Sequence, residues 1–314
     1  MKFRLRTIAF CLLLAGTAAA QAPAGPPKEP IIYKGMGLEG GEFALPPEVE
    51  ARQKQLIDAA LAGVQPQRPG VHDVYVMTAG LWSDHVFENE SSNAADILTE
   101  RYGAQGRRIV LATNYAANGR GLPAATPEHL VAAFGKVGEL MDKDEDIFVL
   151  FMTSHGGPNS GIALRDRERM DYTLSPRNLR GALDKAGIKK RVLILAACYS
   201  GQFVPAFRDD PDTILLTAAS KDRPSFGCQP ERDWTYFGDA FFNRALRAGG
   251  GLVPAFQRAR KQIAQWEAAD GEQPSDPQIY VGAEAAKLLG AVEQSFPPPQ
   301  EIDFASAKPP TATP

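Results

Sequence analysis

The sequence has few cysteines, no long apolar run after its N-terminal segment and no excess of basic charge. It contains 3 Cys among 314 residues and has a formal net charge of −3 at pH 7. Because a membrane-spanning helix needs about 20 consecutive apolar residues, no span is expected beyond the N-terminal segment. A content of 44% hydrophobic and 9% aromatic residues excludes an intrinsically disordered chain, a collagen and a coiled coil. The chain has enough apolar material for one large globular domain.

Several common cofactor and catalytic motifs are also missing. No G-x-S-x-G elbow occurs, which argues against a serine hydrolase that uses this turn. Gly35, Gly37 and Gly40 match the spacing of a dinucleotide fingerprint, but no buried strand precedes them and no helix start follows them. The histidines and acids show no spacing typical of metal ligands on a helix or hairpin. The sequence therefore predicts neither a dinucleotide site nor a metal site.

The first 20 residues have the pattern of an export signal. Three basic residues precede an apolar run at 8–16, and Ala18-Ala19-Ala20 supplies the small residues of a cleavage site. Removal of this segment takes away three basic and no acidic residues, which changes the net charge from −3 to −6. We expect a periplasmic or extracellular protein that has no integral membrane segment after signal removal. Its acidic charge also disfavours nucleic-acid partners.

Composition divides the chain into four segments. Pro is concentrated near both ends, with several Gly in the N-terminal arm, whereas the middle is rich in short apolar runs. Within the first half, the apolar positions of 48–64 repeat at helical spacing, which predicts a helix that docks on the core. The expected segments are a signal peptide at 1–20, a Pro/Gly-rich arm with the docking helix at 21–69, a globular domain at 70–290 and a disordered Pro-rich tail at 291–314.

The central domain alternates short apolar runs with helical patterns. The expected strands are 74–77, 109–112, 147–152, 192–197 and 214–219, with a sixth at 279–281. The expected helices are 87–102, 127–141, 176–186, 201–207, 234–247 and 252–268. Such alternation is typical of a mostly parallel sheet that has helices on both faces. The sequence therefore predicts an α/β fold, a three-layer α/β/α sandwich around a six-stranded sheet.

Two of these strands end in residues suited to nucleophilic catalysis. The third is followed by Ser154-His155-Gly156 and the fourth by Cys198-Tyr199-Ser200-Gly201. Parallel strands bring their carboxyl ends to one edge of a sheet, where ligands gather. A thiol is a good nucleophile only as its thiolate, and a nearby imidazole can take its proton. A helix starting near Gly201 would place its positive end beside the sulfur. The sequence thus predicts a Cys-His site for acyl transfer, with the amides of Gly156 and Cys198 facing the developing oxyanion.

These two motifs resemble those of the legumain (asparaginyl endopeptidase) family of cysteine peptidases, which are relatives of the caspases. The resemblance extends from about Val71 to about Gly290 and includes a third block, Ser225-Phe226-Gly227-Cys228 followed by Tyr236-Phe237-Gly238-Asp239. It implies a caspase-like fold over the 70–290 domain, polypeptide substrates and no metal or organic cofactor. It also implies that His155 is the base, Cys198 the nucleophile and Gly156 an oxyanion-hole donor.

The substrate pocket departs from the pattern of this family. His85 and Asp239 occupy counterparts of legumain pocket residues, whereas Asp84 stands where an Arg is expected. Ala196 replaces a Glu, and Ser225 lies beside the position of the pocket Ser. Loss of the Arg removes the strongest donor for an Asn side chain, so strict Asn specificity is not expected. A pocket floor with Asp84 and Asp239 would instead suit Lys or Arg.

Several alternatives are compatible with the sequence. Cys198 and Cys228 remain after signal removal, and a disulfide between them would silence the nucleophile. An acyl-enzyme can be resolved by an amine as well as by water, so a transamidase or peptide ligase stands beside an endopeptidase. A relative that keeps the fold and binds peptides without turnover is a third possibility. The main hypothesis is a cysteine endopeptidase that works through an acyl-enzyme thioester.

Overall fold

The computed structural model describes residues 39–42, 47–113, 121–166 and 170–300. The predicted signal peptide, most of the arm and the end of the tail lie outside these residues. None of the described helices is both long enough and apolar enough to cross a membrane.

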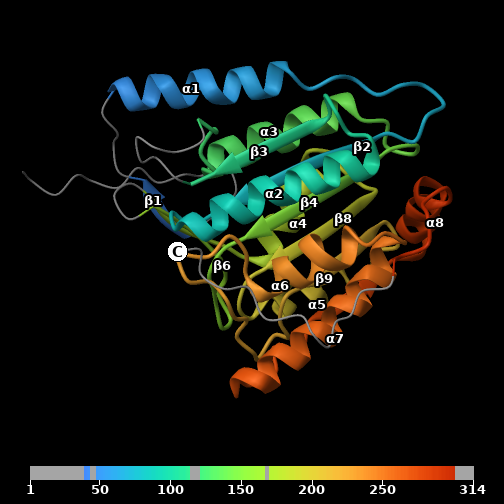
Figure 1. Ribbon diagram of the computed structural model, residues 1–314. Coiled ribbons are helices and arrows are strands. Elements are labelled where there is room, and N and C mark those ends of the chain that lie inside the picture. The colour runs from blue at the N-terminus through green and yellow to red at the C-terminus, as the bar shows by residue number, and fades with distance from the viewer. Residues whose placement is uncertain (1–38, 43–46, 114–120, 167–169, 301–314) are drawn as a thin grey trace, which may run out of the picture.

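A six-stranded sheet forms the centre of the fold (Figure 1). Its strand order is β10-β9-β8-β4-β2-β3, and every pairing is parallel except that of β10 with β9. The strands are β2 (Val74–Gly80), β3 (Arg108–Ala112), β4 (Ile147–Thr153), β8 (Arg191–Ala196), β9 (Thr213–Thr217) and β10 (Gln278–Val281). The apolar runs of β2, β3, β4, β8 and β9 are buried on both faces, as in other covered parallel sheets, whereas the antiparallel edge strand β10 is partly exposed. The predicted mostly parallel sheet is confirmed.

Helices cover both faces of this sheet and make the predicted three layers (Figure 1). One hydrophobic cluster joins the sheet to α1 (Pro47–Ala62), α3 (Pro127–Leu140), α4 (Pro176–Lys185), the 3₁₀ turn η1 (Ser200–Phe203) and α5 (Val204–Phe207). The other joins it to α2 (His85–Tyr102), α6 (Tyr236–Gly238), the π-helix η2 (Asp239–Leu246), α7 (Leu252–Asp270) and α8 (Ala283–Glu293). Local signals set some of these helix starts. Thr126 and Ser175 cap α3 and α4 with their hydroxyls, each followed by Pro.

A second, antiparallel sheet was not predicted. It has the order β1-β7-β6-β5 and consists of β1 (Glu39–Glu42), β5 (Gly156–Gly157), β6 (Gly161–Asp166) and β7 (Met170–Leu174). Three of its strands lie between β4 and α4 in sequence. They are too short and too polar on one side to give the continuous apolar run that marks the central strands.

The C-terminal region also differs from the prediction. The helix α8 extends to Glu293, beyond the predicted tail boundary at 291. Residues 296–300 then pack on the domain, where the Gly250 amide donates to the Pro297 carbonyl (3.0 Å) and the Gln300 amide donates to the Ala248 carbonyl (2.7 Å). Only the part of the predicted tail after residue 300 lies outside the described residues.

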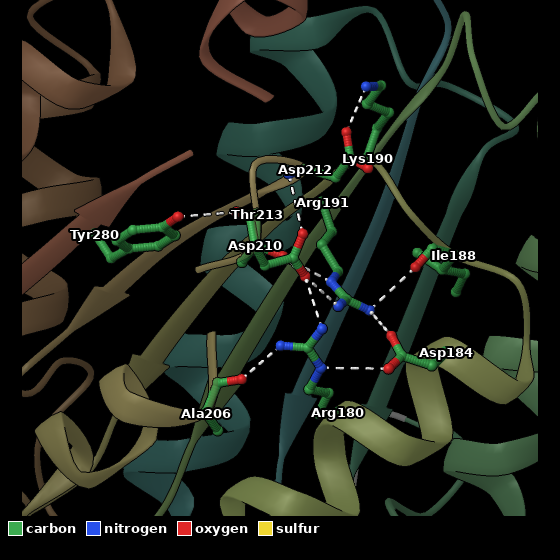
Figure 2. Close-up of polar contacts among 10 residues, drawn as sticks. All are labelled: Arg180, Asp184, Ile188, Lys190, Arg191, Ala206, Asp210, Asp212, Thr213 and Tyr280. Atoms are coloured by element: carbon green, nitrogen blue, oxygen red, sulfur yellow. Dashed lines mark hydrogen bonds and ion pairs between the residues drawn. The ribbon is translucent and has the colours of Figure 1, made fainter. Parts of the chain in front are cut away.

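The amino-terminal edge of the sheet holds a buried ion-pair cluster (Figure 2). Arg191, the first residue of β8, donates to Asp184 and Asp210 at 2.8 Å each and to the Thr213 hydroxyl at 2.8 Å. Arg180 approaches the same two acids from α4. These contacts tie α4 to the starts of β8 and β9, at the end of the strands opposite to His155 and Cys198.

Candidate active site

The strand register brings His155 and Cys198 to one edge of the sheet. Gly80, Thr153 and Ala196 pair across β2, β4 and β8 as the last residues of their strands. The ladder continues one residue further, where the Ser154 amide donates to the Ala196 carbonyl at 3.1 Å. Since His155 and Cys198 both follow two residues after these strand ends, the predicted base and nucleophile emerge from adjacent strands.

The two motifs interlock through Gly156. A Cβ at this position would lie 2.1 Å from the Cys198 carbonyl oxygen and 3.3 Å from the Ala197 Cβ. No side chain fits there without moving one of the two backbones. The glycine therefore sets how closely the turn that follows His155 approaches the backbone of Cys198.

A sharp turn follows the cysteine. Tyr199 adopts a left-handed conformation with φ of 59°, which is uncommon for a bulky residue. Its amide donates to the Arg223 carbonyl at 2.8 Å, which holds the turn against the 219–235 loop. The helix predicted at 201–207 is a 3₁₀ turn followed by one α-helical turn. Its aligned dipole beside the sulfur is accordingly smaller than that of the expected continuous helix.

Ser225 lies against the sulfur of Cys198. Its amide is 3.2 Å from Sγ, its hydroxyl is 3.7 Å from Sγ, and the thiol donates to its carbonyl oxygen at 3.4 Å. Cys198 and Cys228 are both free and half-buried, so the alternative disulfide is not formed in this structure. Burial and the neighbouring Cys198 raise the pKa of the Cys228 thiol.

His155 is held by the segment that connects β2 to α2. Its ring contacts Trp82 and Phe87 edge-on, with centroid separations of 4.7 and 5.0 Å. The Asp84 Oδ2 lies 3.9 Å from His155 Nε2. Burial lowers the pKa of the imidazole below its ordinary value, while the charge of Asp84 acts in the opposite direction. The ring is therefore neutral at pH 7 and able to accept a proton.

The other predicted pocket residues occupy different environments. His85 is exposed at the first position of α2, and Ala196 is buried at the end of β8. Asp239 is buried and accepts from Arg244 at 2.7 Å and from Asn243 at 2.6 Å. Arg244 pairs with Asp239 and Asp84 lies beside His155, so a pocket floor with Asp84 and Asp239 stays a prediction.

Sequence reasoning missed the buried acid Glu90. Its side chain on α2 is fully buried, and Oε1 accepts from the amide (3.1 Å) and hydroxyl (2.6 Å) of Thr235. The Thr153 hydroxyl donates to Oε2, which links Glu90 to the strand that carries His155. Burial raises the pKa of Glu90 to about 7. Its spacing of four residues from Val86 and Ala94, both buried, would have placed it on the apolar face of the helix.

A family model and a solved structure are similar to this chain. A search of the curated proteins found no match. The crystal structure of caspase-1 from Spodoptera frugiperda is similar at 12% sequence identity with a TM-score of 0.44, over 69% of this chain and 93% of that chain. The family model of the peptidase C13 family matches residues 123–287, which include both His155 and Cys198. This match covers more than half of the sequence, and the chain belongs to the peptidase C13 family, the legumain family of cysteine peptidases.

Proposed function

We propose that the protein is a cysteine endopeptidase in which Cys198 is the nucleophile and His155 the general base. The observation that carries this proposal is the interlocked placement of the two residues on adjacent strand ends, with Gly156 packed on the Cys198 carbonyl. An imidazole with a lowered pKa and a free thiol that follow adjacent strands at the carboxyl edge of a parallel sheet suit acyl transfer.

The reaction divides into two steps with a covalent intermediate. His155 takes the thiol proton while the sulfur attacks the peptide carbonyl carbon, and the electron pair of the carbonyl moves to its oxygen. Collapse of this intermediate breaks the C–N bond, and the imidazolium gives its proton to the leaving amine. Water then attacks the thioester with His155 again as base, which releases the acid and restores the thiol.

Two backbone amides are proposed to stabilise the oxyanion. Those of Gly156 and Cys198 belong to the two segments that the close contact at Gly156 holds together. Fixed N–H donors aimed at a developing negative charge typically contribute several kcal/mol to a rate enhancement. Ser225 supports the same geometry, because its backbone contacts keep Sγ in place before attack.

A peptide library varied at the residue before the scissile bond tests the proposal. The mature protein, Cys198→Ala and Cys228→Ala are compared under reducing conditions. We expect turnover by the first and third proteins and a loss on the order of 10⁴-fold or more in Cys198→Ala, because the nucleophile is removed. Cys228→Ala is the matched control, since it removes the other free thiol. Equal activity of Cys198→Ala and wild type would refute the proposal.

The same experiment separates hydrolysis from transfer. With an added amine acceptor, product masses show whether water or the amine resolves the acyl-enzyme. Hydrolysed products alone support the endopeptidase, whereas products that carry the amine would assign the protein as a transamidase. Alkylation of Cys198 without any turnover would favour a relative that binds peptides without cleaving them.

We also propose that this activity is exercised outside the cytoplasm, on the basis of the N-terminal basic and apolar segments. Fractionation of expressing bacteria tests this, with a mature N-terminus near Gln21 in the periplasm or medium as the expected result. An uncleaved protein that stays in the cytoplasm would overturn it.

A further inference from the structure

Asp84 occupies the N-cap of α2 without capping the helix through its side chain. Its backbone has the extended conformation of an N-cap, with φ of −76° and ψ of 142°, and its carbonyl accepts from the Phe87 amide at 3.1 Å. Asp is favoured at this position because its carboxylate accepts from the exposed amides of the first turn. Here no such side-chain bond is formed. The carboxylate is therefore directed to another partner.

The carboxylate faces His155 together with two aromatic rings from the same segment. Asp84 Oδ2 lies 3.9 Å from Nε2, and the two side chains are 16% and 34% exposed. Trp82 and Phe87 contact the ring edge-on within 5.0 Å. Three contacts from the short segment 82–87 thus fix the position and plane of the imidazole. This segment lies outside the residues 123–287 that match the family model.

We propose that Asp84 is a positioning residue that orients His155 for proton transfer from Cys198, an inference that rests on the proposed function. The carboxylate holds the proton of the ring on Nε2, so that Nδ1 is the nitrogen with a free lone pair. When Cys198 attacks, its proton moves from Sγ to Nδ1 and the Nε2 proton stays on the ring. The resulting imidazolium is stabilised by the negative charge of Asp84.

The distance between Asp84 and His155 is compatible with a site that has not yet bound substrate. At 3.9 Å the contact is an ion-pair distance and is longer than a hydrogen bond. Catalytic hydrogen bonds are often long before substrate binds and shorten in the reacting complex. Because Asp84 lies at a helix start, a shift of well under one helical turn would bring the two atoms into hydrogen-bonding contact.

Nuclear magnetic resonance titration of His155 provides a test that does not depend on activity. The chain contains 4 His, so the ring signals can be assigned by substitution. In a Cys198→Ala background, we expect Asp84→Asn to lower the pKa of His155, because the stabilising negative charge is lost. Asp84→Glu keeps the charge and should restore most of the value. The matched control is Asp96→Asn on the exposed side of the same helix, where Asp96 pairs with Arg108 at 2.9 Å.

An unchanged His155 pKa in Asp84→Asn would overturn the inference. This outcome is distinct from failure of the proposed function, because the titration gives a result even if no peptide is cleaved. If Asp84→Asn does not fold, Asp84→Ser takes its place, because it removes the same charge and keeps a favoured N-cap residue. An unchanged His155 pKa in that variant would equally overturn the inference.

Steady-state kinetics then separates positioning from substrate recognition. A positioning role predicts a fall in kcat of about 10–100-fold for all peptides, with KM little changed. A role in the substrate pocket predicts instead a rise in KM confined to peptides with Lys or Arg before the scissile bond. The second result would overturn the inference and restore Asp84 to the pocket that the sequence predicts.

Discussion

Buried charged groups have different partners at the two edges of the central sheet: other charges at the amino-terminal edge and neutral donors at the carboxyl-terminal edge. At the amino-terminal edge, Arg191 is 2% exposed and lies between Asp184 and Asp210 (Figure 2). At the carboxyl-terminal edge, Glu90 is buried among neutral donors of Thr153 and Thr235. The first edge fixes the ionisation of its groups by pairing them, whereas the second leaves its groups able to exchange protons near neutral pH.

The pKa values follow this division. Burial alone would raise the pKa of Asp210, but the hydrogen bond and charge of Arg191, the Asp212 amide and the Thr213 hydroxyl together hold the pKa of that carboxyl below its ordinary value. For Glu90, hydrogen bonds from neutral groups offset burial only in part, so its pKa stays raised at about 7. The ion pairs of Arg191 with Asp184 and Asp210 thus stabilise the fold at the amino-terminal ends of the strands. Glu90, which can exchange a proton near neutral pH, lies at their carboxyl-terminal ends.

Removal of the central cation from the amino-terminal edge should give the largest effect. Arg191→Met leaves Asp210 partly buried without its main partner, so we expect a loss of about 3–5 kcal/mol in the free energy of unfolding. The activity of the folded fraction should not change. Urea denaturation and initial rates measure the two quantities. Arg180→Met is the matched control, because Arg180 contacts the same acids from a more exposed position and should cost under about 1 kcal/mol.

A methyl group added at Gly156, at the carboxyl-terminal edge, should instead reduce activity more than stability. Gly156→Ala places a Cβ against the Cys198 carbonyl and forces apart the segments of His155 and Cys198. A misplacement of about 1 Å typically costs about 100-fold in rate, so we expect a fall of that order in kcat/KM. Gly181→Ala, where a Cβ meets nothing within 4 Å, is the control. Full activity of Gly156→Ala would mean that the interlock does not position the site.

The buried acid gives a smaller and pH-dependent effect. Because the pKa of Glu90 in the folded state, about 7, lies above its ordinary value of 4.5, the folded protein holds this proton more tightly than the unfolded chain. Its contribution to stability is complete below about pH 4.5 and is lost as the pH rises through 7. Relative to Glu90→Gln, wild type should lose on the order of 2 kcal/mol between pH 5 and 8. Parallel pH profiles of the two melting temperatures would contradict this.

The smallest expected effect is a difference between the rates at which the Cys198 and Cys228 thiols are alkylated. Burial keeps the Cys228 thiol protonated at neutral pH, whereas His155 is proposed to take the proton of Cys198. We expect iodoacetamide to label wild type quickly at one site and Cys198→Ala slowly, as followed by peptide mass analysis. Rapid labelling of Cys228 in both proteins would show that it is not shielded.

The sequence was sufficient to predict the three layers and the two strands that precede His155 and Cys198, the proposed catalytic pair. Parallel strands buried on both faces leave long apolar runs, and these runs end directly before the segments of His155 and Cys198. The strands β6 and β7 of the second sheet leave no such run, because they bury mainly alternate residues on one face.

The partners of the charged side chains could not be predicted in the same way. Asp239 and Arg244 are five residues apart on η2, and the π-helical turn brings them into contact. The spacing of an ordinary α-helix favours pairs three or four residues apart. Likewise, an Asp before a helix is read as a cap, and only the structure shows that Asp84 faces a histidine 71 positions later in the chain.

The close contact between Gly156 and Cys198 also determines when the site comes into existence during folding. The two residues follow β4 and β8, separate strands that are joined by a crossover connection, and Asp84 follows a third strand, β2. Contacts between parts so distant in the chain form late, because the entropy of closing the intervening loops must be overcome first. We expect a partly folded chain in which β8 is not in register to lack the proposed Cys198–His155 pair. The proposed activity should therefore appear only once the sheet has assembled.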